Sequence, residues 1–333
     1  MNQPSNSQPN SSDTPRVLVG DIGGTNIRLA IAQNGIADKT TAQKFQIANF
    51  TGPGEAINHY LSTTGTITPD AACLAVAGPI VDRAADMTNS PWDINAEEIE
   101  AQTGITTCAL LNDFEALALS LPILGPSDLK SIGGGAPQPG TRAVLGPGTG
   151  LGVSILARGG DSHIAMPGEG GHVGFAPVTE LEIEILRHLT KLHGRVSAER
   201  LICGSGLEGL HQTLAHIEGR AVENLSAEEI VTSALAGDSA SAQHTIEIFC
   251  AIFGTVAGDL ALVSGAVGGV YLAGGIAQAL AGTLPDTQFR ERFEAKGRLS
   301  CFTQAVPTYV IISPYAALDG AAAAYANLHG PTN

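Results

Sequence analysis

The fold is decided by two similar stretches of sequence, RVLVGDIGGTNIRLAIA at residues 16–32 and RAVLGPGTGLGVSILA at residues 142–157. Each stretch consists of an apolar run, a turn rich in glycine and threonine, and a second run with alternating apolar residues, which predicts a β-hairpin. Successive glycines let backbone N–H groups point into one small concavity, which suits the oxygens of a phosphate group. A single hairpin of this kind is usually only a tight turn. Two matched copies predict a polyphosphate that is held from both sides.

The composition of the chain is typical of an α/β protein with two domains. Its 333 residues include 41 glycines, 44% of the residues are hydrophobic, and only 5% are aromatic. This length suffices for two domains of ordinary size with well-buried cores. The formal net charge is −15, so no basic stripe is present and we expect no nucleic-acid partner. An anionic ligand would have to be held locally, by backbone N–H groups and a divalent cation.

Neither export nor membrane insertion is expected. Residues 1–15 lack an apolar core and basic residues, so they are predicted to be a disordered tail rather than a signal peptide. No apolar run approaches about 18–20 residues without a glycine or a charge, which predicts no membrane span. The scattered cysteines indicate reduced, mostly buried thiols in a cytoplasmic protein, and their spacing excludes a cysteine-rich zinc site. They are Cys73, Cys108, Cys203, Cys250 and Cys301.

Strands and helices alternate along the rest of the chain. The first hairpin is followed by predicted strands at 43–48, 71–77 and 108–111. Helices are predicted at 54–62, from Asp93 or Asn95 to about 102, and at 114–120. After the second hairpin we expect a loop at 163–177 and strands at 269–273 and 308–312. The later helices are predicted at 179–193, 197–202, 206–214, 226–236, 239–264 and 319–328. This pattern predicts a duplicated α/β domain with a ligand cleft between the halves.

Asp21 follows the first predicted strand and precedes the glycine turn. A carboxylate beside a phosphate loop would orient Mg²⁺ or the water molecules bound to it. An Asx turn that caps the hairpin is the alternative interpretation, and the two are compatible.

Asn112 and Asp113 end a predicted buried strand, at the edge where α/β proteins bind their ligands. Asp113 is a candidate general base for taking a proton from an attacking hydroxyl group. Its alternative role is the N-cap of the helix predicted at 114–120.

The stretch PGEGGH at residues 167–172 places a carboxylate, Glu169, three residues before an imidazole, His172. A glycine-rich turn has no core to bury, so both side chains are predicted to face a cleft and to bind a polyhydroxylated ligand. A metal site would need further ligands, for which His163 is the obvious candidate, and we consider it the weaker interpretation. Ser197 is a predicted N-cap, and Glu199 is either an acceptor for ligand hydroxyls or a charge at the helix start.

Two common nucleotide-binding motifs are excluded. The stretch GSGLEG at residues 204–209 matches the dinucleotide-binding pattern, but it follows a helical stretch rather than a strand. The sequence also contains no P-loop pattern.

Six motifs in this chain resemble those of the bacterial glucokinases and occur in the same order. They are VGDIGGTN (19–26), LNDF (111–114), GPGTGLG (146–152), PGEGGH (167–172), SAER (197–200) and LAGGI (272–276). The similarity extends from about residue 16 to 328. The cysteine-rich zinc motif of the related repressor/open-reading-frame/kinase group is missing, so the resemblance is to the group without structural zinc.

The resemblance implies a two-domain, actin-like ATPase fold of the ribonuclease H-like type, with a cleft between domains that close on ATP and a sugar. The implied small domain comprises residues 16–122 and 314–330, and the large domain comprises residues 123–313. The implied activity is transfer of the γ-phosphate of Mg·ATP to the 6-hydroxyl of D-glucose by a homodimer.

The resemblance also implies the site residues. Asp113 would be the catalytic base, and the glucose ligands would be Asn112, Asp113, Glu169, His172 and Glu199. The ATP-binding residues would be Gly20, Asp21, Ile22, Gly23, Gly24, Thr25, Gly148, Thr149, Gly150, Gly274 and Gly275. No side chain is expected to bind Mg²⁺ directly, and Asp21 would reach it through water.

Three alternative functions remain. The motifs do not distinguish hexoses that differ at carbon 2, so a kinase for mannose, fructose or glucosamine is the nearest alternative. A non-catalytic, sugar-sensing regulator would need a DNA-binding domain before the first hairpin, which starts at residue 16. A phosphatase acting on polyphosphate would leave Glu169 and His172 without a role.

Overall fold

The computed structural model of this chain describes residues 15–87, 90–160 and 162–329. The predicted tail therefore lies almost entirely outside the described residues. The chain divides into two compact units. The first unit includes the described residues up to Ile123 and from Tyr315 onward, and the second unit is Leu124–Pro314.

The first unit is built on a sheet with the strand order β3-β2-β1-β5-β9, and β4 also pairs with β2. Its strands are β1 (Val17–Ile22), β2 (Asn26–Gln33), β3 (Ile36–Ala37), β4 (Gln43–Gln46), β5 (Ala71–Val76) and β9 (Thr107–Asn112). A smaller sheet contains β6 (Ile80–Val81), β7 (Ala84–Asp86) and β8 (Asp93–Asn95). The helices are α1 (Pro53–Thr64), α2 (Ala96–Thr103), α3 (Asp113–Ser120) and α11 (Ala316–His329).

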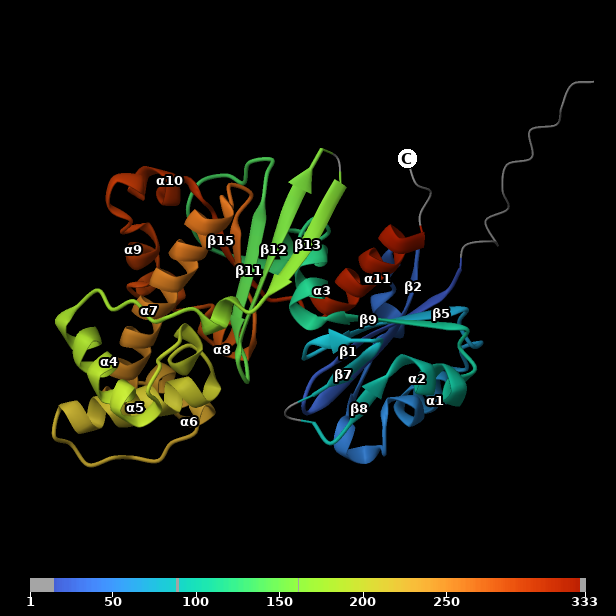
Figure 1. Cartoon of the computed structure of the whole chain (residues 1–333), viewed down its shortest axis with the longest axis horizontal. Helices are drawn as coiled ribbons and strands as arrows, with labels where there is room; N and C mark the ends of the chain where they lie inside the picture. Colours follow the sequence, from blue (N-terminus) through green and yellow to red (C-terminus); the bar gives the residue numbers. More distant parts are fainter. Residues whose placement is uncertain (1–14, 88–89, 161, 330–333) are drawn as a thin grey trace, which may run out of the picture. The chain divides into compact units, whose positions relative to one another are not determined.

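Alternating side chains of β1 enter two different cores, one on each face of this sheet. Leu18 packs in the core that α1 and α2 cover, whereas Val19 packs in the core that α3 and α11 cover (Figure 1). The second core is rich in alanine, and α11 and α3 approach each other closely there, because a Cβ at Gly320 of α11 would lie only 1.7 Å from the carbonyl oxygen of Ala116 of α3. The parallel pairs β1–β5 and β5–β9 bring the ends of β1 and β9 to one edge of the sheet.

The second unit repeats this topology with the order β10-β15-β14-β11-β12-β13. Its strands are β10 (Leu129–Gly133), β11 (Arg142–Pro147), β12 (Leu151–Gly159), β13 (Ser162–Gly168), β14 (Val270–Leu272) and β15 (Thr308–Ile311). Its helices are α4 (Glu180–His193), α5 (Gly204–Ile217), α6 (Ala227–Ala236), α7 (Ala240–Ser264), α8 (Gly275–Leu280), α9 (Phe289–Glu294) and α10 (Ser300–Ala305). In both units an antiparallel hairpin is extended by two parallel strands, which is the predicted duplication.

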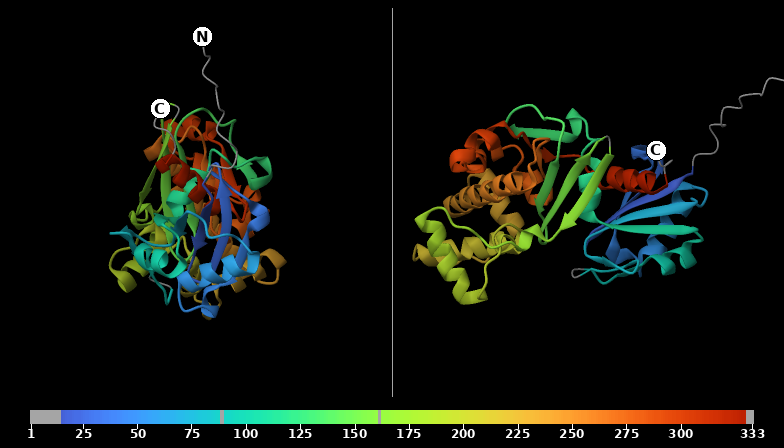
Figure 2. Two further views of the ribbon diagram at one scale, coloured as in Figure 1. Left: turned by 90° about the vertical axis from the view of Figure 1, so that its right-hand side faces the viewer. Right: turned by 45° about the horizontal axis from the view of Figure 1, so that its top comes forward.

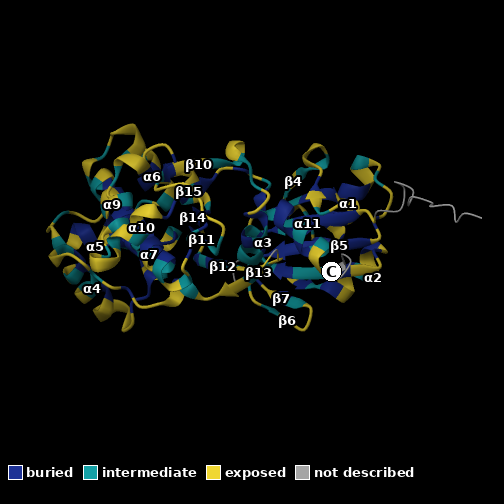
Figure 3. Cartoon of the chain, turned by 90° about the horizontal axis from the view of Figure 1, so that it is seen from above, coloured by how far each residue is buried: buried dark blue, intermediate teal, exposed yellow. Residues whose placement is uncertain are grey.

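Helix α7 is the central helix of the second unit and packs beside β11 (Figures 1 and 2). Its Phe249 and Phe253 are fully buried in the core that also contains Leu145 of β11. Among the described residues it is the single helix long and apolar enough to cross a membrane, and 61% of its most apolar window is buried inside the protein. Its apolar composition is thus explained by its place in the core. In Figure 3 the exposed residues lie mainly on the outer sides of helices and in loops.

The structure corrects several predicted elements. The loop predicted at 163–177 begins with strand β13, which pairs along the edge of β12. The helix predicted at 197–202 is a short 3-10 helix, Ala198–Arg200. The small sheet, β10, α9 and α10 were not predicted, because they are short and lack a clear period. Asn95 rather than Asp93 caps α2, since its side chain accepts hydrogen bonds from the backbone of Glu97 and Glu98.

Candidate active site

The first hairpin leaves two amide groups free at its tip. Gly23 donates its N–H to the carbonyl of Asn26 at 3.0 Å. Within the described part of the chain, the N–H groups of Gly24 and Thr25 have no hydrogen-bond partner. Gly20 and Ile22 lie inside strand β1, and a Cβ at Gly20 would meet Leu74 at 2.6 Å. Gly20 therefore leaves room for the side chains of Leu74 and Leu29, and the turn at Gly23–Thr25 offers the donors.

Asp21 is held by an arginine, Arg28, that lies outside the glycine motif. Arg28 lies opposite Asp21 across the hairpin, and its Nη1 donates to Oδ2 of Asp21 at 2.9 Å. This ion pair takes the place of the expected Asx turn. Burial raises the pKa of Asp21, and the charge and hydrogen bond of Arg28 only partly oppose that effect. The pairing register of the hairpin would have identified Arg28, because residues opposite each other on a pleat share a face.

Asn112 rather than Asp113 is the N-cap of α3. Its Oδ1 accepts hydrogen bonds from the backbone N–H groups of Phe114, at 2.9 Å, and Glu115, at 3.2 Å, and its Nδ2 donates to the carbonyl of Gly78 at 3.3 Å. Asp113 occupies the first helical position, where its Oδ1 also accepts from Phe114 at 2.9 Å. The capping role considered for Asp113 is therefore performed by its neighbour.

The surroundings of Asp113 suit it to accept a proton. Burial and, to a smaller extent, the negative charge of Asp21 together raise the pKa of its carboxyl group to about 6, against the hydrogen bond from the backbone of Phe114. A carboxylate with a pKa near 6 is ionised at neutral pH and is a better base than an ordinary aspartate. Asp21 and Asp113 come from the ends of β1 and β9, so the sheet edge brings together the two acidic side chains that the sequence predicted.

The second hairpin has a three-residue tip with the same property. Gly148 donates its N–H to the carbonyl of Gly150 at 2.8 Å, between the paired residues Pro147 and Leu151. The amides of Thr149 and Gly150 have no hydrogen-bond partner among the residues that the structure describes. Both hairpins therefore offer two adjacent N–H donors at their tips, as expected for phosphate oxygens.

Gly274 lies against Pro147, the last residue of the first strand of the second hairpin. Its φ of +87° is a conformation that favours glycine, and a Cβ there would lie 2.3 Å from the carbonyl oxygen of Pro147. Gly275 begins helix α8 and has open space where a Cβ would be. Gly274 thus lets α8 approach the strand that leads into the hairpin, whereas Gly275 leaves room for a ligand.

Glu169, His172 and Glu199 lie together in the second unit. His172 lies between the two carboxylates, with its Nε2 3.8 Å from Oε2 of Glu169 and its Nδ1 3.8 Å from Oε1 of Glu199. The side chains of Glu169 and His172 are 81% and 57% exposed, and that of Glu199 is 28% exposed. Loosely paired, accessible groups of this kind are suited to accept and donate hydrogen bonds to sugar hydroxyls.

Close packing holds the loop that carries these groups, residues 168–176. A Cβ at Gly171 would lie 2.2 Å from the carbonyl oxygen of Leu151, and one at Gly170 would meet Val153 at 2.9 Å. The guanidinium of Arg195 donates to the carbonyl of His172 at 2.6 Å. The glycines of the PGEGGH motif therefore bring the loop onto strand β12.

Metal binding by side chains alone finds no support in the described part of the chain, where no group of three or more His, Cys, Asp or Glu residues is placed to hold an ion. His163 lies on β13 opposite Arg158. The carboxylate of Asp21 lies near enough to Asp113 to raise its pKa. Mg²⁺ is usually held by few carboxylates together with phosphates and water, so the residues present fit the expected contact of Asp21 with the ion through water. The absence of structural zinc stays a prediction.

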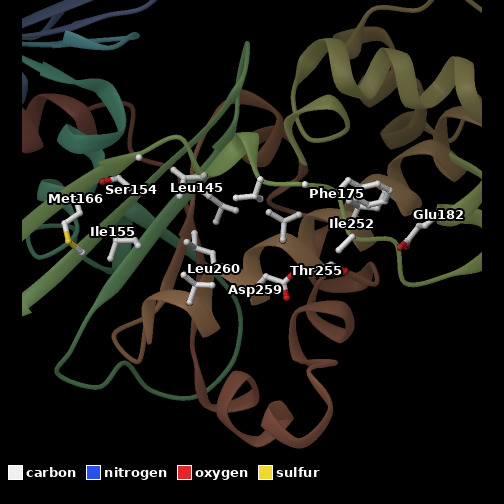
Figure 4. A pocket seen from close by; sticks show the side chains of 18 residues that line it. Leu145, Ser154, Ile155, Met166, Phe175, Glu182, Ile252, Thr255, Asp259 and Leu260 are labelled. Carbon is white, nitrogen blue, oxygen red and sulfur yellow. The ribbon is translucent and has the colours of Figure 1, made fainter. Parts of the chain in front are cut away.

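A pocket of about 250 Å³ lies between the sheet of the second unit and α7 (Figure 4). Apolar side chains such as Leu145, Ile155, Ile252 and Leu260 line it. Gly168, Gly170 and Val173 belong to its lining, but Glu169 and His172 do not. The pocket is therefore distinct from the polar group formed by Glu169, His172 and Glu199.

A family model described as Glucokinase matches residues 18–328. The chain belongs to the glucokinase family. A glucokinase from Caulobacter sp. (strain K31) is 47% identical over 310 residues, which are 92% of this chain and 94% of that protein.

Solved structures of glucokinases share the fold. The crystal structure of a glucokinase from an Antarctic psychrotroph has a TM-score of 0.83 and 36% identity, and the match covers 94% of this chain and 99% of that one. A ROK family glucokinase from Streptomyces griseus, in complex with glucose and AMPPNP, has a TM-score of 0.62 at 18% identity, over 92% and 98% of the two chains. At that identity the likeness is one of fold, and it confirms the predicted actin-like ATPase fold.

Proposed function

We propose that this chain transfers the γ-phosphate of ATP to the 6-hydroxyl of D-glucose, giving glucose 6-phosphate and ADP, with Asp113 as the general base. Membership of the glucokinase family supports an ATP-dependent hexose kinase that acts on glucose. The single observation that supports the role of Asp113 is its geometry. Its neighbour Asn112 caps helix α3, so the carboxylate of Asp113 remains available at the sheet edge with a pKa of about 6.

Phosphoryl transfer needs positioning and charge neutralisation more than covalent chemistry. In the proposed mechanism Asp113 accepts the proton of the 6-hydroxyl as that oxygen attacks the γ-phosphorus. The free amides of Gly24, Thr25, Thr149 and Gly150 hold phosphate oxygens, which places the leaving group in line.

Glucose is proposed to be bound by Asn112, Asp113, Glu169, His172 and Glu199. The accessible carboxylates and imidazole in the second unit support this set, because charged acceptors form strong hydrogen bonds to hydroxyl groups. We propose that Gly20, Asp21, Ile22, Gly23, Gly148, Gly274 and Gly275 complete the ATP site through backbone atoms and shape.

Mg²⁺ enters bound to ATP in this proposal and neutralises phosphate charge. Asp21 is proposed to contact it through water, because Oδ2 of Asp21 is already bonded to Arg28.

A coupled assay of ADP release tests the function. The protein is given Mg·ATP with glucose, mannose, fructose, glucosamine or no sugar. We expect glucose-dependent turnover with the highest kcat/KM for glucose. A higher kcat/KM for another hexose would assign the protein to that sugar, and no turnover with any of them would refute the proposal.

We further propose that the protein is a cytoplasmic homodimer whose product enters glycolysis. Exposed apolar side chains beside the pocket of Figure 4 support self-association: Met166 is 47% exposed, Val173 54% and Val263 84%. Sedimentation velocity should show a dimer that Val263→Asp weakens. A monomer at micromolar concentration would contradict the dimer. Cell fractionation would test the location.

We also propose that residues 16–122 with 314–330, and 123–313, form the two domains that close on the substrates. The division of the chain into two compact units supports these limits.

A further inference from the structure

A short segment of the second unit, residues 197–204, contacts two parts of the proposed site. One is the loop of residues 168–176, which we call the sugar-binding loop, and the other is the second hairpin, residues 142–159. We call residues 197–204 the bridging segment. On the side of the loop, Ser197 forms an isolated β-bridge with Gly174, and Ala198 donates its N–H to the carbonyl of Val173 at 2.9 Å. The loop that carries Glu169 and His172 is thus tied to the start of this segment by backbone hydrogen bonding.

The same segment contacts both ends of the tip of the second hairpin, which we call the phosphate hairpin. Oε2 of Glu199 accepts the backbone N–H of Leu151 at 2.8 Å, just after the tip. Gly204 donates its N–H to the carbonyl of Gly148, the first residue of the tip, at 2.9 Å. The packing is tight, because a Cβ at Gly150 would lie 2.5 Å from Oε2 of Glu199.

The carboxylate of Glu199 is therefore divided between two tasks. Oε2 is bonded to the hairpin, while Oε1 faces Nδ1 of His172 at 3.8 Å. A carboxylate is planar and rigid, so a displacement of one oxygen also displaces the other. The side chain of Glu169, by contrast, is 81% exposed, and within the described part of the chain its carboxylate pairs with His172. Of these two acidic residues, Glu199 is the less exposed and is bonded to the hairpin.

We propose that Glu199 is a positioning residue that couples hexose binding to nucleotide binding inside the second unit. This inference rests on the proposed function of the site. A hexose hydroxyl bonded to Oε1 fixes the carboxylate in the orientation in which Oε2 holds Leu151, and so fixes the hairpin that binds the phosphates. By thermodynamic linkage, bound nucleotide raises the affinity for the hexose by the same factor.

The test compares two alanine variants of acidic residues, Glu199→Ala and Glu169→Ala. The Kd of AMPPNP with Mg²⁺ is measured by calorimetry without glucose and with saturating glucose, and the ratio is the coupling factor. For the unaltered protein we expect a ratio within the usual range of about 5–150. Glu169→Ala should weaken glucose binding but keep this ratio, whereas Glu199→Ala should lower it at least threefold. Thermal melts would confirm that both variants are folded.

A second variant tests the contact between Glu199 and the hairpin by a change in the hairpin. Gly150→Ala places a methyl group against Oε2 of Glu199 without touching the sugar-binding loop. We expect it to weaken glucose binding as well as AMPPNP binding. Equal coupling factors for the two glutamate variants, or unchanged glucose affinity in Gly150→Ala, would overturn the inference. An unaltered protein that does not bind glucose at all would instead refute the proposed function.

Discussion

Asn112 and Asp113 divide two tasks that a single aspartate at a helix start would have to combine. Asn112 satisfies the free N–H groups at the start of α3, and Asp113 keeps its carboxylate for chemistry. Burial and the charge of Asp21 both disfavour the ionised form of Asp113, which is why its pKa is raised to about 6.

This raised pKa predicts the pH dependence of the reaction. A general base works only when deprotonated, so kcat/KM for glucose should be constant above pH 7 and fall about tenfold per pH unit below about 6. The variant Glu169→Gln serves as a control, because it should lower kcat/KM while keeping the same midpoint. A midpoint near 4 in the unaltered protein would contradict the assigned environment of Asp113.

Helix α8 packs against the second hairpin at Gly274. Gly274 permits that contact through its positive φ and through the absence of a Cβ beside Pro147. Substitution of Gly274 by alanine should lower the free energy of unfolding by about 2 kcal/mol or more, since the backbone strain alone costs about 1–2 kcal/mol. Gly275→Ala should be neutral or stabilising by up to about 1 kcal/mol. Urea unfolding of both variants measures the difference, and equal stabilities would contradict this explanation.

Elements that have a local sequence pattern could be predicted, whereas contacts between distant segments could not. Both hairpins, the strand that ends at Asn112 and most long helices follow from local patterns of apolar residues and glycine. The contact between Glu199 and Leu151 joins residues 48 positions apart, so no local pattern encodes it. Strand β13 was missed because glycine, proline and histidine dominate its surroundings, although its pairing with β12 satisfies its backbone.

At the scale of the whole molecule, the duplicated topology could be predicted because the two hairpins are similar in sequence. The roles of individual residues came mainly from the resemblance to the glucokinases. From the local sequence, a structural role explains each residue as well as a functional role does. Asp113 could be a helix cap, Asp21 could form a turn, and Glu199 could be a charge at a helix start. Only the structure shows that Asn112 is the cap, that Arg28 holds Asp21, and that Glu199 touches the hairpin.

Domain closure gives a prediction at this scale. The two compact units are expected to close on glucose, which would exclude water from the reacting phosphate. Small-angle X-ray scattering should therefore show a smaller radius of gyration with D-glucose than without it. L-glucose is the control and should leave the radius unchanged. Identical radii with and without bound D-glucose would contradict closure.

The most direct measurement of the proposed mechanism is the kcat of Asp113→Asn with glucose and Mg·ATP. The amide keeps the shape of the side chain but cannot accept the proton, so kcat should fall by at least about 10²-fold. Calorimetry on the same variant should show that glucose and AMPPNP still bind. A kcat close to that of the unaltered protein would contradict the role of Asp113 as the general base.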